Sequence, residues 1–411
     1  MRLSLVEELR ISLLALGEIE NRKSVQENSI SSSNLPLTEY VAYIASLISD
    51  FKYGKWNFHL ITKYSPRQVR IRMDIEFSSY ACGLPRVLRN FLASPRSSKT
   101  ILGLSDSSHI HWISPREDAM QLHRAFKGMG CDTSTVINIL AHRDAEQRGL
   151  IQQEFETRFG DELVKHLHSE LHGHVKKAVL LWMHEPVARD ATILRNAFKG
   201  TITNHEAAIE VICSRSSAHL RQIKQIYYSM FDTRLQQDIE SEAFGNYKKL
   251  LLAYVSTTRY EGPEIDKLMV ENDVKALHRA EDNCFIQIFC ERSRAHLVAV
   301  ESAFHATYGK PLRKVLKRET SGIFKHALMT ILQCAEDPAK YFAKVLHKAM
   351  KGLGTDDTTL IRVVVTRAEF DMRQVKLEYR KIYKKTLYDA VHSETSGNYR
   401  SFLLSLIGSN V

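Results

Sequence analysis

The residues best suited to chemistry in this sequence lie in two short glycine-containing loops and at two distant glutamates. Residues 350–357 read MKGLGTDD, and Glu394 follows 42 residues after Gly352. Residues 126–130 read FKGMG, and Glu170 follows 42 residues after Gly128. Paired glycines let the backbone turn so that several carbonyl oxygens point the same way. Carbonyls plus one carboxylate make an all-oxygen site, which suits a hard cation such as Ca²⁺. A single loop of this kind would also fit an ordinary joint between two helices.

Four internal repeats supply the elements that must position these loops. Their first marker is an arginine, which recurs after 72, 77 and 75 residues at Arg143, Arg215, Arg292 and Arg367. An aromatic residue follows each arginine after 12 residues, at Phe155, Tyr227, Phe304 and Tyr379. A glutamate follows each after 27 residues, at Glu170, Glu242, Glu319 and Glu394.

Helical periodicity begins at residue 114, where Pro115 fits a first helical position. Turn signals then divide each repeat into about five short helices, and helices joined by short loops pack as antiparallel neighbours. The glycine loop and the glutamate turn of one repeat can therefore meet at one edge of the bundle. Residues 1–113 differ from this pattern, and we expect a weakly ordered or unassigned extension there.

Composition narrows the class of protein. The chain has 411 residues, 44% of them hydrophobic, which is ample for a packed core. No apolar run is long enough to span a bilayer. Six scattered cysteines suit a reducing compartment. The formal charge of +10 favours acidic partners such as anionic lipid or nucleic acid.

The repeats, with the K-G-x-G loop at their head and the glutamate 42 residues on, closely resemble the annexin family. The stretches ILAHR (139–143), LLW (180–182) and PVARDA (186–191) resemble plant annexins in particular. The resemblance implies an all-α, slightly curved disc of four repeats with calcium loops on its convex face. We expect residues 1–113 to be an N-terminal extension and the repeats to occupy residues 114–185, 186–261, 262–336 and 337–411.

The family pattern, carried onto this sequence, implies two calcium sites. In each, three backbone carbonyls and one glutamate bind the ion. The implied ligands are Phe126, Gly128, Gly130 and Glu170 in repeat 1, and Met350, Gly352, Gly354 and Glu394 in repeat 4. Repeat 2 keeps Lys199-Gly200 but lacks the second glycine, and repeat 3 is six residues shorter where the loop should be. Because Glu242 and Glu319 persist without such a loop, this glutamate could also have a structural capping role.

Backbone carbonyls and one carboxylate leave coordination positions to water, which lipid phosphate oxygens can replace. Between the paired glycines, Met129 and Leu353 could enter the headgroup region, or be ordinary loop hydrophobes tucked inward. The neighbouring Lys127 and Lys351 would meet anionic lipid.

Other residues suggest redox or metal chemistry, each with a simpler structural alternative. His142 matches a histidine proposed as a haem ligand in plant annexins, but also fits a surface or capping histidine. Cys213 and Cys334 resemble a proposed redox pair, but also fit buried inert thiols. Four histidines crowd the Glu170 turn, where a transition metal or plain solvation is possible: His166, His168, His172 and His174. The basic and aromatic run 379–385 could touch nucleic acid or actin, or form the solvated face of a helix.

Three functions remain open from the sequence. We favour a non-enzymatic, calcium-dependent phospholipid-binding protein, cytoplasmic and peripheral on membranes when calcium rises. We expect it to be monomeric in solution and to associate laterally, if at all, on the membrane. Its expected partner is an anionic membrane, and actin or other proteins are further candidates. We expect it to bind no specific nucleic acid. The alternative is a helical scaffold that binds proteins or RNA through a basic surface independently of calcium. The third is an oxidoreductase that uses His142 or the cysteines.

Overall fold

The computed structural model describes residues 58–65, 68–75, 114–127, 130–279, 281–352 and 354–409. The chain divides into two compact units, Met1–Ile110 and His111–Val411. In the first unit, β1 (Phe58–Ser65) and β2 (Gln68–Ile75) pair antiparallel. We did not predict this strand pair in the extension. The rest of the prediction for residues 1–113 lies outside the described residues.

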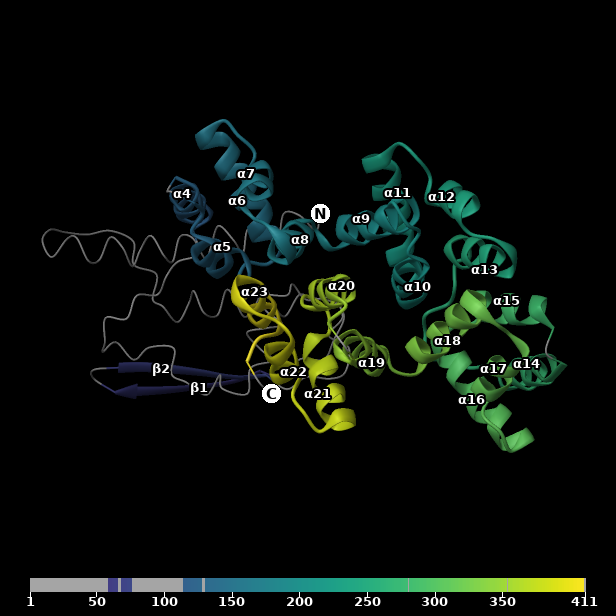
Figure 1. Cartoon of the computed structure of the whole chain (residues 1–411). Coiled ribbons are helices and arrows are strands. Elements are labelled where there is room, and N and C mark those ends of the chain that lie inside the picture. Colours follow the sequence, from purple (N-terminus) through teal and green to yellow (C-terminus); the bar gives the residue numbers. More distant parts are fainter. Residues whose placement is uncertain are drawn as a thin grey trace, which may run out of the picture. The chain divides into compact units, whose positions relative to one another are not determined.

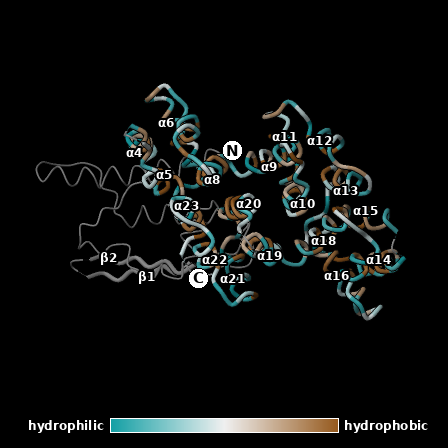
Figure 2. The backbone as a smooth tube through the Cα atoms, in the orientation of Figure 1, coloured by the Kyte–Doolittle hydropathy of each residue, from teal (hydrophilic) through white to brown (hydrophobic). Residues whose placement is uncertain are grey.

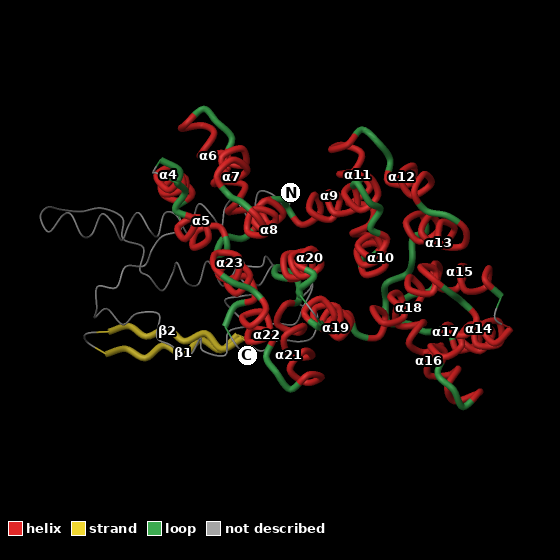
Figure 3. Tube along the Cα trace, viewed as in Figure 1, coloured by secondary structure: helices red, strands yellow, loops and turns green. Residues whose placement is uncertain are grey.

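The second unit is built from helices, as Figure 3 shows in red. It holds twenty α-helices and, over its described residues, no β-strand. The all-α prediction is therefore confirmed for this unit. Pro115 starts the first of these helices, as its position in the sequence predicted.

The twenty helices form four sets of five along the chain (Figure 1). The first set is α4 (Pro115–Ala125), α5 (Thr133–Leu140), α6 (Ala145–Phe159), α7 (Leu163–Glu170) and α8 (Gly173–Met183). The second is α9 (Pro186–Lys199), α10 (His205–Ser214), α11 (Ser217–Phe231), α12 (Leu235–Glu242) and α13 (Gly245–Ser256). The third is α14 (Lys267–Arg279), α15 (Asp282–Glu291), α16 (Arg294–Tyr308), α17 (Leu312–Glu319) and α18 (Gly322–Glu336). The fourth is α19 (Pro338–Met350), α20 (Asp357–Arg367), α21 (Met372–Tyr383), α22 (Leu387–Glu394) and α23 (Gly397–Ile407). We number the repeats 1 to 4 in this order.

Equivalent residues start and stop the helices in each repeat. The third helix of every repeat is followed by a residue in the left-handed conformation, and these four residues are Gly160, Asp232, Gly309 and Lys384. The fifth helix of every repeat begins at a glycine with positive φ, between 55° and 61°, and these are Gly173, Gly245, Gly322 and Gly397. A side chain is strained in that conformation, so glycine recurs where the chain turns from the fourth helix into the fifth.

The buried side chains form two hydrophobic cores rather than four. One core joins repeats 2 and 3, where α10 and α13 pack against α18. The other joins repeats 1 and 4, where α8 packs against α20 and α23. In Figure 2 the tube of α20 is brown, which matches its buried run Val363–Val365. Repeats next to each other in sequence therefore need not share a core.

Buried ion pairs connect the two cores. Arg362 of α20 donates to both carboxylate oxygens of Glu210 on α10, at 3.0 Å each. Arg189 of α9 donates to Glu369 at 3.0 Å. Arg148 of α6 pairs with the same Glu369 carboxylate at 3.2 Å, which links repeats 1 and 4 within their shared core. Removing one partner of such a pair leaves an unpaired buried charge, so these contacts fix how the helices fit together.

No helix in the described part of the chain is long and apolar enough to cross a membrane.

Candidate metal centres

The loop between α19 and α20 carries the candidate ligands of repeat 4. Met350 is buried and anchors the start of the loop, while Gly352 and Gly354 are exposed with φ of 129° and 91°. The backbone N–H of Asp356 donates to Ala349 O at 2.8 Å and closes the loop. Among the described residues, none donates a hydrogen bond to the carbonyl oxygens of Met350, Gly352 or Gly354. Within the described part of the loop, an ion would therefore have no hydrogen-bond donor to displace from these oxygens.

Glu394 lies against this loop. The hydroxyl of Thr355 donates to Glu394 Oε2 at 3.2 Å, and its distance to the backbone O of Glu394 is 3.4 Å. The structure thus brings together the loop and the glutamate that lies 39 residues after Thr355. Leu353 lies outside the described residues.

The loop of repeat 1 closes in the same way. The N–H of Asp132 donates to Ala125 O at 2.9 Å, and Gly130 has a φ of 94°. Burial raises the pKa of the Cys131 thiol, and the negative charge of Glu170 adds to this rise. Gly128 and Met129 lie outside the described residues, so the structure does not place the carbonyl proposed for Gly128.

All four repeated glutamates are the last residues of their helices: α7, α12, α17 and α22. The C-terminal end of a helix carries partial negative charge, which disfavours a carboxylate there unless a cation lies nearby. None of the four side chains accepts a hydrogen bond from a backbone N–H in the described residues. Over that part of the chain, these carboxylates therefore do not cap a helix or a loop through a backbone N–H.

Repeat 2 provides its own cation for this carboxylate. Lys199 Nζ donates to Glu242 Oε1 at 3.0 Å, and the Thr203 hydroxyl donates to Oε2 at 3.1 Å. The hydrogen bond from Lys199 lowers the pKa of Glu242. Gly200 has a φ of −69°, unlike Gly352 at the equivalent position. Ile202 stands where repeats 1 and 4 have Gly130 and Gly354.

Repeat 3 has no room for a loop, since α14 ends at Arg279 and α15 begins at Asp282. Its glutamate, Glu319, forms an ion pair with the neighbouring Arg318. In the described residues, Glu170 and Glu394 have no ion-pair partner, whereas Glu242 and Glu319 do.

The arginine that revealed the repeats has a structural role. In repeats 1, 2 and 3 it pairs with an aspartate on the first helix of its repeat, as Arg143–Asp118, Arg215–Asp190 and Arg292–Asp273, at 2.6–2.7 Å. In repeat 4 the aspartate is replaced by Phe342, whose ring lies 4.3 Å from the Arg367 guanidinium carbon. Arg367 pairs instead with Asp371 at 2.6 Å.

The residues considered for redox chemistry have structural surroundings. His142 is exposed, with its Nδ1 2.8 Å from Asn138 O, as expected of a surface histidine. Cys213 and Cys334 are each 1% exposed, and burial raises the pKa of both thiols, of Cys334 to about 12. The prediction that these two thiols are buried is confirmed.

The histidines near Glu170 do not converge on one point. His166 lies 3.1 Å from Asp161 and stacks on Phe126, whereas His174 lies 3.4 Å from Asp357. No group of three or more His, Cys, Asp or Glu side chains that could hold a metal ion occurs in the described residues. The sites of repeats 1 and 4 would each use one carboxylate and main-chain oxygens, which is a different kind of site.

The basic and aromatic run 379–385 lies at the end of α21. Tyr379 is buried, and the ring of Tyr383 stacks on His347 at 3.7 Å. Rings already packed in this way are not free to stack on bases, which fits the helix-face interpretation.

These features define a four-repeat helical protein with carbonyl loops in two repeats. A sequence model of the annexin family matches residues 117–182, 189–254, 274–331 and 341–406. The chain belongs to the annexin family, which is known for calcium-dependent phospholipid binding and whose members are generally non-enzymatic binders. The four matched stretches fall inside the four predicted repeats, although the repeat boundaries themselves stay predictions.

Relatives and solved structures agree with this assignment. The chain is 62% identical to Annexin D5 of Arabidopsis thaliana over 305 residues, which are 72% of this chain and 96% of that protein. It is 37% identical to Annexin A13 of Mus musculus, covering 74% of this chain and 98% of the relative. The likeness to plant annexins is thereby confirmed.

Among solved structures, chicken annexin V matches with a TM-score of 0.69 at 35% identity, over 74% of this chain and 98% of its own. A calcium-bound structure of annexin (Sm)1 matches with a TM-score of 0.65 at 29% identity, over 73% and 91% of the two chains.

Proposed function

We propose that repeats 1 and 4 each bind Ca²⁺ and thereby attach the protein to anionic phospholipid. The ligands would be the carbonyls of Phe126, Gly128 and Gly130 with Glu170, and those of Met350, Gly352 and Gly354 with Glu394. The observation that carries this proposal is the contrast among the four glutamates. Each ends a helix, but only Glu170 and Glu394 lack a cationic partner in the described residues, and both belong to repeats with a two-glycine loop.

Loop and glutamate would fill only part of the coordination shell of Ca²⁺, which takes about 6–8 oxygen ligands. Water would hold the remaining positions until phosphate oxygens of a lipid replace it. Calcium then raises the affinity for lipid, and lipid raises the affinity for calcium by the same factor. This chain's own contribution is to hold the oxygens in place and to leave one side of the ion open.

Repeat 2 would touch the same membrane through apolar contacts. Its loop residue Ile202 is 84% exposed, and Phe244, in the turn after Glu242, is 66% exposed. Ile202 stands at the position of Gly130 and Gly354 in the loops of repeats 1 and 4, and Phe244 lies in the turn that follows the repeated glutamate. Exposed apolar side chains beside a membrane surface can enter the headgroup region. Met129 and Leu353 would act alike in repeats 1 and 4, with Lys127 and Lys351 meeting anionic headgroups.

The same proposal describes the protein as cytoplasmic, monomeric in solution and peripheral on membranes when calcium rises, with no catalytic step of its own. Actin or other proteins remain candidate partners, with no feature of the described residues that selects one.

Co-sedimentation of the full chain with phosphatidylcholine–phosphatidylserine vesicles, with calcium and with chelator, tests the proposal. We expect binding with calcium and release by the chelator. Binding to a protein or RNA that survives the chelator and falls steeply with salt would favour the scaffold alternative instead. A haem absorption band that is lost in His142→Ala would favour the redox alternative.

A further inference from the structure

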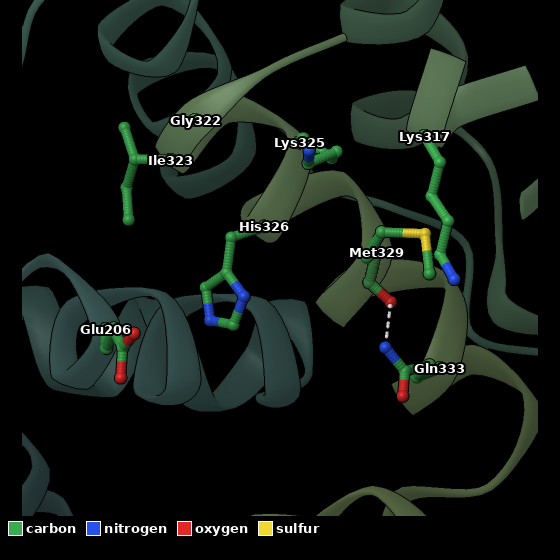
Figure 4. A pocket seen from close by; sticks show the side chains of 8 residues that line it. All are labelled: Glu206, Lys317, Gly322, Ile323, Lys325, His326, Met329 and Gln333. Atoms are coloured by element: carbon green, nitrogen blue, oxygen red, sulfur yellow. Dashed lines mark hydrogen bonds between the residues drawn. The ribbon is translucent and has the colours of Figure 1, made fainter.

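A cavity of about 490 Å³ lies between α10 of repeat 2 and α17 and α18 of repeat 3. Figure 4 shows His326 projecting from α18 toward the helix that carries Glu206, with Lys317 and Lys325 on other sides of the same space. The volume is in the range of about 300–1,000 Å³ that small-molecule sites occupy.

This cavity opens at the edge of the bundle where the candidate calcium ligands lie. Gly322, at its wall, is the repeat-3 equivalent of Gly397, which follows Glu394 by three residues in repeat 4. Glu206, at the opposite wall, lies 3.7 Å from Lys348, two residues before the candidate ligand Met350. A membrane held by the repeat 4 loop would therefore lie close to this cavity.

The lining of the cavity is positively charged. Lys317 and Lys325 form no ion pair in the described part of the chain, whereas the only acidic side chain of the lining, Glu206, is already paired with Lys348. Burial lowers the pKa of His326, so its neutral ring offers one N–H donor at neutral pH.

The first turn of α18 adds backbone donors to these side chains. Gly322 and Ile323 line the cavity, and the first intrahelical bond of α18 is donated by Lys325 to Ser321 O. No side chain caps this end of the helix. Free N–H groups at a helix start, next to two lysines, suit the several oxygens and double charge of a phosphate monoester.

We propose that this cavity binds the phosphate-monoester headgroup of a phosphorylated anionic lipid, without calcium. Repeat 3 has lost its calcium loop, and lysine ammonium groups would take over the contact with phosphate there. The inference rests on the proposed membrane function, since it assumes that this edge of the bundle faces lipid. If the headgroup also contains a ring, the ring would fill the part of the cavity that the phosphate leaves empty.

The test measures vesicle binding of the full chain in chelator, where the calcium sites cannot contribute. One set of phosphatidylcholine vesicles contains phosphatidylinositol 4-phosphate, and the other contains phosphatidylglycerol at matched surface charge. We expect about tenfold stronger binding to the first set, because phosphatidylglycerol carries only a phosphodiester. Equal binding to both sets would overturn the proposal.

Two charge reversals on α17 make the test specific. Lys317 lines the cavity, whereas Lys314 is exposed on the same helix, outside the lining and without an ion pair in the described residues. Lys317→Glu should weaken binding to the phosphoinositide vesicles about tenfold, and Lys314→Glu less than about twofold, although both change the net charge equally. Equal losses would show general electrostatics and refute a built site. Lys325→Glu should repeat the Lys317→Glu result.

Two further measurements identify the ligand's source and keep the proposals separable. Soluble inositol 1,4-bisphosphate should displace the protein from the phosphoinositide vesicles only at concentrations well above that of the lipid phosphate. If the soluble compound binds more tightly than the vesicles do, the lipid assignment is overturned. All three variants should keep calcium-dependent binding to phosphatidylserine vesicles, which also reports that they are folded. If the wild-type protein lacks that binding, the proposed function fails, whereas failure of the cavity leaves it intact.

Discussion

Repeats 2 and 4 share one backbone design but provide different surroundings for the same glutamate. Both loops close with an N–H to O bond of 2.8 Å, donated by Asn204 in repeat 2 and Asp356 in repeat 4. Both loops contact the glutamate through a threonine, Thr203 at 3.1 Å and Thr355 at 3.2 Å. The frame that brings loop and glutamate together therefore does not depend on the second glycine.

The two repeats differ in what balances the carboxylate. Repeat 2 has Ile202 in place of Gly354, and its Lys199 turns to Glu242. The equivalent Lys351 has no carboxylate partner in the described residues and remains exposed. The lysine ammonium of repeat 2 thus balances the charge of the glutamate, as we propose that Ca²⁺ does in repeat 4. On this proposal, one lost glycine and one reoriented lysine distinguish the ion pair of repeat 2 from the ion site of repeat 4.

The largest expected effect comes from removing the charge of the unpaired glutamate. Glu394→Gln should raise the calcium concentration for half-maximal liposome binding by about tenfold or more, or ~1.4 kcal/mol and upward, because a hard divalent ion needs the carboxylate. Vesicle co-sedimentation across a calcium series measures it.

Glu242→Gln and Glu319→Gln are the matched controls for this change, since both carboxylates already have cationic partners. Each should shift the midpoint by less than about twofold, ~0.4 kcal/mol. Equal losses in all the glutamate variants would end the two-site interpretation.

A second prediction transfers the sequence of repeat 2 into repeat 4. Gly354→Ile places a β-branched residue at a φ of 91°, where only glycine is unstrained, although no atom lies within 4 Å of the added Cβ. The loop should change conformation and calcium-dependent binding should weaken about fivefold to tenfold, with the fold retained. We would check it with the same calcium series and with circular dichroism.

The reverse change, Ile202→Gly, is the control for that prediction. It should not create a third site by itself, because Lys199 still pairs with Glu242. If Gly354→Ile leaves calcium binding unchanged, the glycine is not what distinguishes the two loops.

Glu170→Gln should have an intermediate effect, about threefold to fivefold on the same midpoint. Repeat 1 keeps both glycines but has Cys131 where repeat 4 has Thr355, so it lacks the hydroxyl that holds the glutamate against the loop. Cys131→Thr should then tighten calcium-dependent binding slightly. An effect of Glu170→Gln larger than that of Glu394→Gln would reverse our ranking of the two sites.

Much of this arrangement could be predicted from the sequence because it depends on spacing. The recurring arginine, aromatic and glutamate residues identified four helical repeats, and the missing glycine and deleted loop identified the altered repeats 2 and 3. The aspartates that pair with the arginines were equally visible, since Asp118 and Asp190 both precede their arginines by 25 residues. The glycines that follow each glutamate by three residues were a further unused signal.

Other features could not be predicted, because they depend on how distant helices pack. Nothing in the spacing indicates that repeats 1 and 4 share one core while repeats 2 and 3 share another. The orientation of a lysine is also hidden, since Lys199 and Lys351 precede a glycine in the same way. The lining of the cavity comes from α10, α17 and α18, which belong to two repeats.

The smallest expected effect concerns the acid stability of the lysine–glutamate pair. Lys199 lowers the pKa of Glu242 below the ordinary value of about 4.3 for the unfolded chain. The unfolded state then binds more protons at mildly acidic pH, so this pair contributes stability that is present above pH ~4.3 and is lost as pH falls through the folded pKa. Lys199→Met should therefore flatten the decline of the unfolding free energy between about pH 5 and 3, measured by urea denaturation. Lys351→Met, at the equivalent position of repeat 4, should leave that slope unchanged, since Lys351 has no carboxylate partner in the described residues. Identical slopes for wild type and both variants would mean that the Lys199–Glu242 contact is too weak in solution to replace an ion.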